Sequence, residues 1–268
     1  MTAKGIKISG LTPDRLAASG ALEGALAKFD WFYIGAEFCE NLIPPPAQLL
    51  RTAEFFLRRG RRVCLLTPPV SERGIKSLAA VFRKLRPLAA ELELTANDFG
   101  TMELAAELGF GARVSAGRLL LDNLFIPSKT RLQLVNAEAL RFFTSRGVSR
   151  FEISSAGAKP RSNFGEWRRR GFRPSDFSLT LYYPYLNMTT TRACLLGAPD
   201  IPPHGSVKGI FCRRECGAAS FEVRHPLINE ELLVQGNTVF MRFPRKFYSS
   251  EKDLEKLRVD RLVYCPKP

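Results

Sequence analysis

The sequence predicts an α/β fold, a (β/α) barrel-like domain with parallel strands and an extended, irregular C-terminal part. Segments of strand character alternate with amphipathic helical segments in about seven units, which is typical of a parallel sheet. The length of 268 residues suits a single barrel, which needs about 250 residues. An open doubly wound sheet is the alternative, but no G-x-G-x-x-G turn follows the first strand, and this favours the barrel.

The first half of the chain supplies most of the expected units. Runs rich in aromatic or branched residues predict strands, and apolar residues at helical spacing predict helices. In order, we expect a strand at Lys7–Ser9, a helix capped by Thr12 and apolar from Leu16 to Phe29, a strand at Trp31–Gly35, a helix from Pro46 to Arg59, a strand at Arg62–Thr67, a helix at Ser71–Leu85, a strand at Glu91–Thr95, a helix at Asp98–Leu108 and a strand at Ala112–Ala116.

The second half completes the series and then changes character. We expect a helix at Asn136–Ser145, strands at Arg150–Ser154 and Ser178–Tyr183, a helix at Phe164–Arg170, extended segments at Phe221–Arg224 and Leu232–Phe243 with a turn at Gln235–Asn237, a helix at Glu251–Leu257 and a strand at Arg261–Tyr264. We expect one domain, 1–268, with a cysteine-bearing loop at 192–216 and an extended C-terminal segment at 219–268.

The composition favours a folded protein that does not span a membrane. Hydrophobic residues make up 45% of the chain, which is enough for a packed core. No apolar run approaches the roughly 20 residues that span a bilayer, and the start lacks the apolar core of a signal peptide. We therefore expect a cytoplasmic protein without a transmembrane segment.

The net charge of +14 favours polyanions or an acidic partner. The densest basic run, Trp167–Arg173, mixes arginine with aromatic residues, as an RNA-binding surface can. A solvated helix end explains the run more simply, because one run does not make a continuous patch.

Four of the six cysteines follow predicted strands. Cys39 comes shortly after the strand Trp31–Gly35, and Cys194, Cys212 and Cys216 lie in the loop after Ser178–Tyr183. Loops that follow the strands of a parallel barrel all open on one face, so these cysteines can meet there. The other two cysteines are Cys64, which lies inside a strand, and Cys265, which lies in the C-terminal tail.

Four converging thiolates suit a tetrahedral zinc ion or an iron–sulfur cluster. Zinc sites usually show two short cysteine pairs, whereas here only Cys212 and Cys216 are close in sequence, and this dispersed layout favours a cluster. A disulfide between Cys212 and Cys216 is a third possibility, which a reducing cytoplasm disfavours. His204, in the same loop, is an alternative ligand, although a histidine on a loop surface is the simpler interpretation.

The segments WFYIGAEFCEN, RRVCLLTPP, ELTANDFGTMELA, TRAC and CRREC occur in this order. With them the chain resembles the collagenase-like peptidase family (the U-thirty-two family), over roughly residues 30 to 240. Within that family it is most similar to the short, single-domain UbiV-type subfamily of oxygen-independent ubiquinone biosynthesis.

The resemblance implies a (β/α) barrel and a [4Fe–4S] cluster held by Cys39, Cys194, Cys212 and Cys216. It also implies a part in hydroxylation without dioxygen, as a component of a hydroxylase complex with a paralogous family member and in contact with proteins of a lipid pathway. The alternatives are an RNA-modifying member of the family, a zinc-stabilised non-catalytic binding subunit, and a peptidase. We find no G-x-S-x-G or H-E-x-x-H motif that would support a peptidase.

Two carboxylates are catalytic candidates. Asp98 follows the strand Glu91–Thr95 and could serve as a proton donor, or it could cap the next helix. Glu37, two residues before Cys39, could orient a substrate or lie solvated in its loop.

Overall fold

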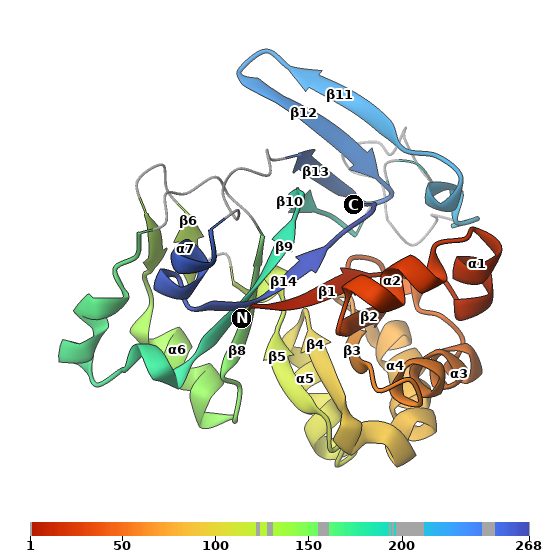
Figure 1. The fold of residues 1–268 in the computed structure, drawn as a ribbon, viewed down its shortest axis with the longest axis horizontal. Coiled ribbons are helices and arrows are strands. Elements are labelled where there is room, and N and C mark those ends of the chain that lie inside the picture. The colour runs from red at the N-terminus through yellow and green to blue at the C-terminus, as the bar shows by residue number, and fades with distance from the viewer. Residues whose placement is uncertain are drawn as a thin grey trace.

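The computed structural model describes residues 2–121, 124–127, 131–154, 161–192, 194, 196, 212–242 and 250–267. Eight parallel strands close into a barrel in the order β1-β14-β9-β8-β5-β4-β3-β2, with helices on the outside (Figure 1). The predicted (β/α) barrel is thus confirmed. No helix in the described ranges combines the length and the apolar character needed to cross a membrane.

The barrel strands are short and follow one another around the barrel in chain order. They are β1 (Ala3–Lys7), β2 (Trp31–Gly35), β3 (Arg62–Leu66), β4 (Leu92–Ala96), β5 (Arg113–Ala116), β8 (Arg150–Ser154), β9 (Ser178–Tyr183) and β14 (Val259–Tyr264).

Helices connect the strands along the outside of the barrel. The α-helices are α1 (Pro13–Ala18), α2 (Leu22–Lys28), α3 (Pro46–Leu57), α4 (Glu72–Leu85), α5 (Phe99–Glu107), α6 (Ala137–Ser145) and α7 (Glu251–Lys256), and the 3-10 helices are η1 (Glu40–Leu42), η2 (Arg86–Glu91), η3 (Arg118–Leu120), η4 (Phe164–Arg170), η5 (Pro174–Asp176) and η7 (Glu215–Gly217).

Two antiparallel sheets are added to the barrel. A small hairpin joins β6 (Phe125–Pro127) to β7 (Leu132–Leu134), and a four-stranded sheet has the order β10-β13-β12-β11. Its strands are β10 (Tyr185–Thr190), β11 (Phe221–His225), β12 (Ile228–Gln235) and β13 (Thr238–Arg242). The C-terminal part is extended, as expected, and its strands are regularly paired: β11, β12 and β13 form part of this sheet, and β14 pairs with both β1 and β9.

The beginning of the chain also differs from its prediction. The first strand is Ala3–Lys7 instead of Lys7–Ser9, since residues from Ala3 onward pair with β14. The single helix expected up to Phe29 is split into α1 and α2, because Gly20 has a φ of +70° and left-handed backbone ends a helix. The helix expected at Phe164–Arg170 is present as the 3-10 helix η4.

Successive side chains of a strand point to opposite faces, so the buried residues of the barrel strands divide between the barrel interior and an outer core under the helices. In β2, Phe32 points outward and stacks on Phe56 of α3 with ring centroids 3.9 Å apart, while Trp31 and Tyr33 belong to the interior cluster. Barrel interiors are usually filled by branched aliphatic residues. Here the buried residues inside the barrel or at its ends include six charged ones, namely Lys7, Glu37, Glu93, Arg118, Glu152 and Arg261.

The base of the barrel, formed by Trp31, Glu93 and Arg261 near the N-terminal ends of the strands, contains a buried ion pair. Arg261 Nη1 lies 2.6 Å from Glu93 Oε2 and donates to Tyr33 Oη at 2.9 Å. Its guanidinium also stacks 3.4 Å from the Trp31 ring. Arg113 approaches the same carboxylate at 3.6 Å, but its side chain is 78% exposed.

We therefore expect Arg261→Ala to lower the free energy of unfolding by about 3–5 kcal/mol, because it leaves Glu93 buried without its partner. Arg113→Ala, which removes an exposed partner of the same carboxylate, should lower it by less than about 1 kcal/mol. Urea unfolding followed by circular dichroism measures both values. Equal losses in the two variants would contradict this assignment.

Candidate functional site

Four cysteines lie in segments that follow β2 or connect β10 to β11. Cys39 follows β2 and is the N-cap residue of η1. Cys194 follows β10 instead of β9, because β10 intervenes after the predicted strand. Cys212 and Cys216 precede β11, and Cys216 lies in η7. We call these residues the cysteine quartet. Most of the predicted loop 192–216, including His204, lies outside the described residues.

The structure brings the cysteine quartet together. Burial raises the pKa of the Cys216 thiol, and Cys194, Cys39 and Cys212 each raise it further. Burial likewise raises the pKa of Cys39, with contributions from Cys212 and Cys194. The four thiols are therefore close enough to influence one another electrostatically. All six cysteines of the chain are free thiols, so the predicted alternative of a Cys212–Cys216 disulfide is not present.

Backbone N–H groups point at two of these sulfurs. The N–H of Arg214 donates to Cys212 Sγ at 3.4 Å, and the N–H groups of Asn41 and Leu42 lower the pKa of Cys39 against the effect of its burial. Arg214 has a φ of 62°, a conformation that costs a non-glycine residue roughly 1–3 kcal/mol. N–H donors of this kind stabilise thiolates and tune the groups that thiolates bind.

The donor set of the quartet is chemically suited to a thiolate-bound zinc ion or iron–sulfur cluster, since it offers four sulfurs and N–H donors around them. The four cysteine side chains are not arranged around a single metal ion. Over the described ranges, no group of three or more His, Cys, Asp or Glu side chains is placed to hold one metal ion. Of the two histidines, His225 is described; it is exposed, and its Nδ1 accepts from the N–H of Leu227 at 3.2 Å.

Glu40 anchors the Cys39 segment to the barrel wall. Its Oε2 accepts from the Ser71 N–H at 2.7 Å and from Ser71 Oγ at 2.8 Å. Ser71 is in turn the N-cap residue of α4. A Cβ on Gly74 would lie 2.4 Å from Glu40 Oε2, so only glycine leaves room for this carboxylate. The residue next to Cys39 is thus held by the first turn of a long helix.

The mouth of the barrel, formed by Lys7, Glu37, Arg118 and Ser154 at the C-terminal ends of the strands, is closed by buried charges. Arg118 Nε and Nη2 each lie 2.7 Å from a carboxylate oxygen of Glu37, and Lys7 Nζ lies 3.3 Å from the same group. Burial acts to raise the pKa of Glu37, but Arg118 and Lys7 outweigh it and the pKa is lowered. Glu37 is therefore a buried, paired anion and not a solvated loop carboxylate.

The mouth also contacts the sheet above it. Arg118 Nη1 donates to Ser154 Oγ at 2.9 Å and to the Tyr185 carbonyl at 3.3 Å. Ser154 Oγ in turn donates to Asn187 Oδ1 at 2.8 Å. Because Tyr185 and Asn187 belong to β10, one guanidinium joins the barrel to the sheet.

Asp98 caps the helix α5, which is one of the two roles predicted for it. Its Oδ1 accepts from the Thr101 N–H and its Oδ2 from the Val70 N–H, each at 2.6 Å. Both oxygens are therefore engaged with backbone. This occupancy disfavours Asp98 as a proton donor and explains its position just before α5.

Sequence reasoning missed Glu152, a buried carboxyl in the middle of the barrel. Its oxygens accept from Thr95 Oγ1 at 2.9 Å and from Tyr182 Oη at 2.7 Å. Burial raises the pKa of Glu152 to about 7. Cys64 lies beside this group, with its Sγ 3.1 Å from Thr95 Oγ1. The available signal was a glutamate inside the predicted strand RFEIS.

Cys265 was also misjudged from the sequence. Cys265 directly follows β14 and is 1% exposed. It belongs to the interior cluster that contains Tyr33 and Tyr182. Burial raises the pKa of its thiol, while Lys7 and Arg118 act to lower it. Cys265 therefore belongs to the mouth of the barrel and not to a free tail.

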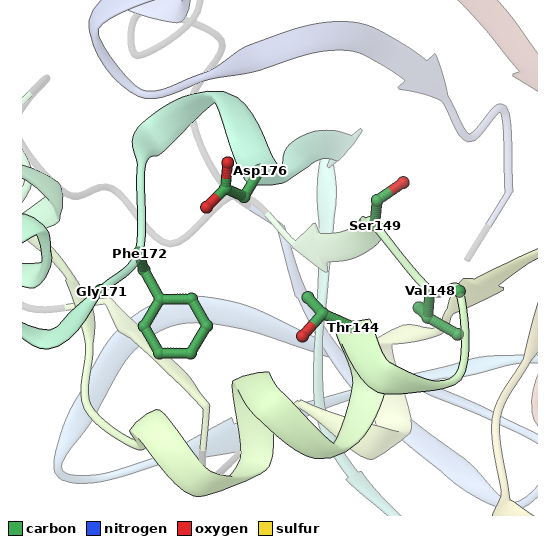
Figure 2. Close-up of a pocket in the computed structure, with 7 residues that line it drawn as sticks. Thr144, Val148, Ser149, Gly171, Phe172 and Asp176 are labelled. Carbon is green, nitrogen blue, oxygen red and sulfur yellow. The ribbon is translucent and has the colours of Figure 1, made fainter.

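The predicted basic run exposes its arginines and buries its two aromatic residues. Trp167 and Phe172 are buried, whereas Arg168, Arg169 and Arg170 are exposed. Phe172 also lines a surface pocket of about 320 Å³, and Figure 2 shows Phe172, Thr144 and Asp176 around it. This pocket lies beside the starts of β8 and β9, at the opposite end of the barrel from the loops that hold the cysteine quartet.

No protein-family profile and no curated protein matches this sequence. Among solved structures, the chain is similar to a class V chitinase from Nicotiana tobaccum, with a TM-score of 0.42 and 12% identity over 98% of this chain and 93% of that chain. It is also similar to a glycoside hydrolase family 18 chitinase from Cycas revoluta in complex with (GlcNAc)3, with a TM-score of 0.41 and 12% identity over 98% and 94% of the two chains.

A family 18 N-acetylglucosaminidase from Paenibacillus barengoltzii gives a TM-score of 0.39 and 10% identity, over 98% and 94% of the two chains. At such identities and TM-scores, the similarity carries no argument about family, substrate or activity.

The raised pKa of Glu152 predicts a specific pH dependence of stability. The folded state holds the proton more tightly than the unfolded state, whose glutamate titrates near pH 4.3. The stabilisation is complete below that value and is lost as the pH rises to about 7. Wild type should lose on the order of 2–3 kcal/mol across this window relative to Glu152→Gln, which cannot titrate. Parallel pH profiles of the two proteins would contradict this; urea unfolding at pH 5, 6, 7 and 8 measures them.

Proposed function

We propose that the chain is an iron–sulfur protein in which Cys39, Cys194, Cys212 and Cys216 hold a [4Fe–4S] cluster. The observation that supports this most is the mutual effect of the four thiols on the pKa values of Cys39 and Cys216. Cys39 comes from the first quarter of the chain, and the other three come from its second half. Cys64, which belongs to the barrel interior instead, is not one of them.

The surroundings of the quartet fit an electron-carrying group. A bound cluster supplies one-electron transfer, at a potential set by burial, charge and N–H donors. Cys216 is buried, and N–H groups face Cys39 and Cys212. Arg214 follows Cys212 by two residues, and a positive charge near four thiolates offsets part of their negative charge.

We further propose that the protein takes part in oxygen-independent hydroxylation of a ubiquinone precursor, as a component of a cytoplasmic complex with a paralogous subunit. This part rests on the resemblance of the segments around Cys39, Asn97, Cys194 and Cys212 to the collagenase-like peptidase family. Pairing with a paralogue and contact with lipid-pathway proteins carry the same support.

An RNA-modifying role is the second candidate, and two observations favour it. The net charge is +14, and Arg168, Arg169 and Arg170 of η4 are all exposed. Against it, Trp167 and Phe172 are buried and cannot stack on bases. Filter binding should show salt-sensitive RNA affinity if this role applies, and Arg168→Glu should then weaken it.

Metal content tests the cluster. Anaerobic purification should give a brown protein with about four iron and four sulfide per chain. Cys39→Ala or Cys216→Ala should remove most of the iron and the visible absorbance, because each deletes one of four ligands. Iron and sulfide assays with a visible spectrum measure the loss.

Cys64→Ala is the matched control, since it removes a buried thiol that lies outside the quartet, and it should keep the cluster. A colourless protein that carries one zinc would contradict the proposal and support the alternative of a zinc-stabilised binding subunit. Equal loss of iron from Cys64→Ala and Cys216→Ala would show that the ligands are assigned wrongly.

The hydroxylation role predicts a phenotype that depends on oxygen. Cells that lack this chain should make less ubiquinone than their parent strain without dioxygen and the same amount with dioxygen. Complementation with Cys216→Ala should fail, while complementation with Cys64→Ala should succeed. Liquid chromatography of extracted quinones measures the difference, and an equal defect with and without dioxygen would contradict the role.

A further inference from the structure

We propose that the turn between β12 and β13, formed by Gln235, Gly236 and Asn237, sets the relative positions of the cysteine-bearing segments, with Asn237 as the main positioning residue. The inference rests on the proposed function only in naming the group that the cysteines bind. The contacts themselves apply to any group held by the four thiolates.

Asn237 joins two segments that carry cysteines. Its Nδ2 donates to the Phe38 carbonyl at 2.9 Å and to the Thr191 carbonyl at 2.8 Å. Phe38 directly precedes Cys39, and Thr191 lies three residues before Cys194. One amide group therefore spans from the loop after β2 to the end of β10, across 153 positions of sequence between the two acceptors.

The rest of Asn237 is fixed as well. Its side-chain oxygen accepts from Thr238 Oγ1 at 3.2 Å, and its carbonyl accepts from the Thr191 N–H at 3.0 Å. The residue is 8% exposed. Both amide protons are thus used between two backbone carbonyls, in a place where water cannot easily replace them.

The other two turn residues contact the third segment. Gln235 Nε2 donates to the Cys216 carbonyl. Gly236 has a φ of +62°, and a Cβ added to it would lie 3.2 Å from Cys216 Cβ and 3.5 Å from its sulfur. Glycine at the first position of a two-residue hairpin loop is typical of a type II′ turn, and here it also lets the turn press against Cys216.

The packing of the sheet on the barrel holds this turn in place. Phe240 of β13 meets Phe38 with ring centroids 5.1 Å apart, and β13 pairs with β10 from Tyr185 to Thr190. The turn therefore reaches the quartet from a rigid sheet. Because the turn contacts the segments of Cys39, Cys194 and Cys216, the packing of the sheet on the barrel affects where these three cysteines lie.

Asn237→Asp tests the role of the amide. The substitution keeps the size of the side chain, removes both donors and turns a carboxylate toward two carbonyls. Asn163→Asp is the matched control. Asn163 is also 8% exposed, and its Nδ2 donates to the Leu134 carbonyl at 2.9 Å, away from the quartet.

The readout is the rate at which dibromobimane bridges pairs of thiols, measured by peptide mass spectrometry. It uses the full chain after chelation of metal under anaerobic, reducing conditions, with circular dichroism to confirm folding. Loss of two buried hydrogen bonds should slow bridging of Cys39 to Cys194 about tenfold. Bridging of Cys212 to Cys216, which are neighbours in sequence, should be unchanged.

Gln235→Ala, which removes the donor to the Cys216 carbonyl without straining the backbone, tests the second arm of the turn. It should slow bridging of Cys39 to Cys216 and leave bridging of Cys39 to Cys194 at the wild-type rate. The proposal is overturned if folded Asn237→Asp bridges Cys39 to Cys194 at the wild-type rate. It is also overturned if Asn163→Asp slows that pair as much.

A second readout applies to the protein as isolated. Asn237→Asp should shift the midpoint potential or the electron paramagnetic resonance spectrum of the bound group, and Asn163→Asp should leave both unchanged. If metal analysis finds zinc or no metal, the proposed function fails, whereas the bridging result still decides the role of Asn237.

Discussion

The structure depends on the insertion of β14 between β1 and β9, which closes the barrel with a strand from the end of the chain. A parallel barrel has no free edge only when its last strand is in place. The chain leaves the barrel at the C-terminal end of β9 and must return to the opposite end to begin β14. The four-stranded sheet is built within this excursion, so it lies over the mouth because the barrel closes as it does (Figure 1). The segments with Cys194, Cys212 and Cys216 belong to the same excursion, which is why they meet the Cys39 loop.

Buried charge is the second constraint on this fold. The base holds Arg261 against Glu93, and the mouth holds Arg118 and Lys7 against Glu37. Buried ion pairs offset their own desolvation only when the geometry is good, so they are weak evidence for stability. Here the ion pairs fix the relative positions of the segments that they join. Arg118 has donors aimed at Glu37, at Ser154 and at the Tyr185 carbonyl, and one guanidinium therefore fixes the approach of the sheet to the barrel.

Much of the fold could be predicted from the sequence, and the reason is local. The strand Trp31–Gly35 and the caps Asp98 and Asn136 each carry a signal within a few residues. The quartet could be placed on one face because loops after parallel strands share that face. The interior could not be predicted, since polar residues in ELELT and RFEIS suggest a solvent-facing side of a strand. Helices cover the outside of this barrel, so the apolar side faces them and Glu93 and Glu152 point inward. The position of Cys265 at the mouth follows from the register of β14, and no local sequence pattern predicts that register.

The distance in sequence between Cys39 and Cys216 has a consequence for synthesis of the protein. Ribosomes add about 5–20 residues per second, so the Cys39 thiol exists for on the order of ten seconds or more before Cys216 has been made. During that interval no sheet lies over the mouth, and the first thiol has no partner. Any group held by all four thiols can therefore bind only after Cys216 has been made.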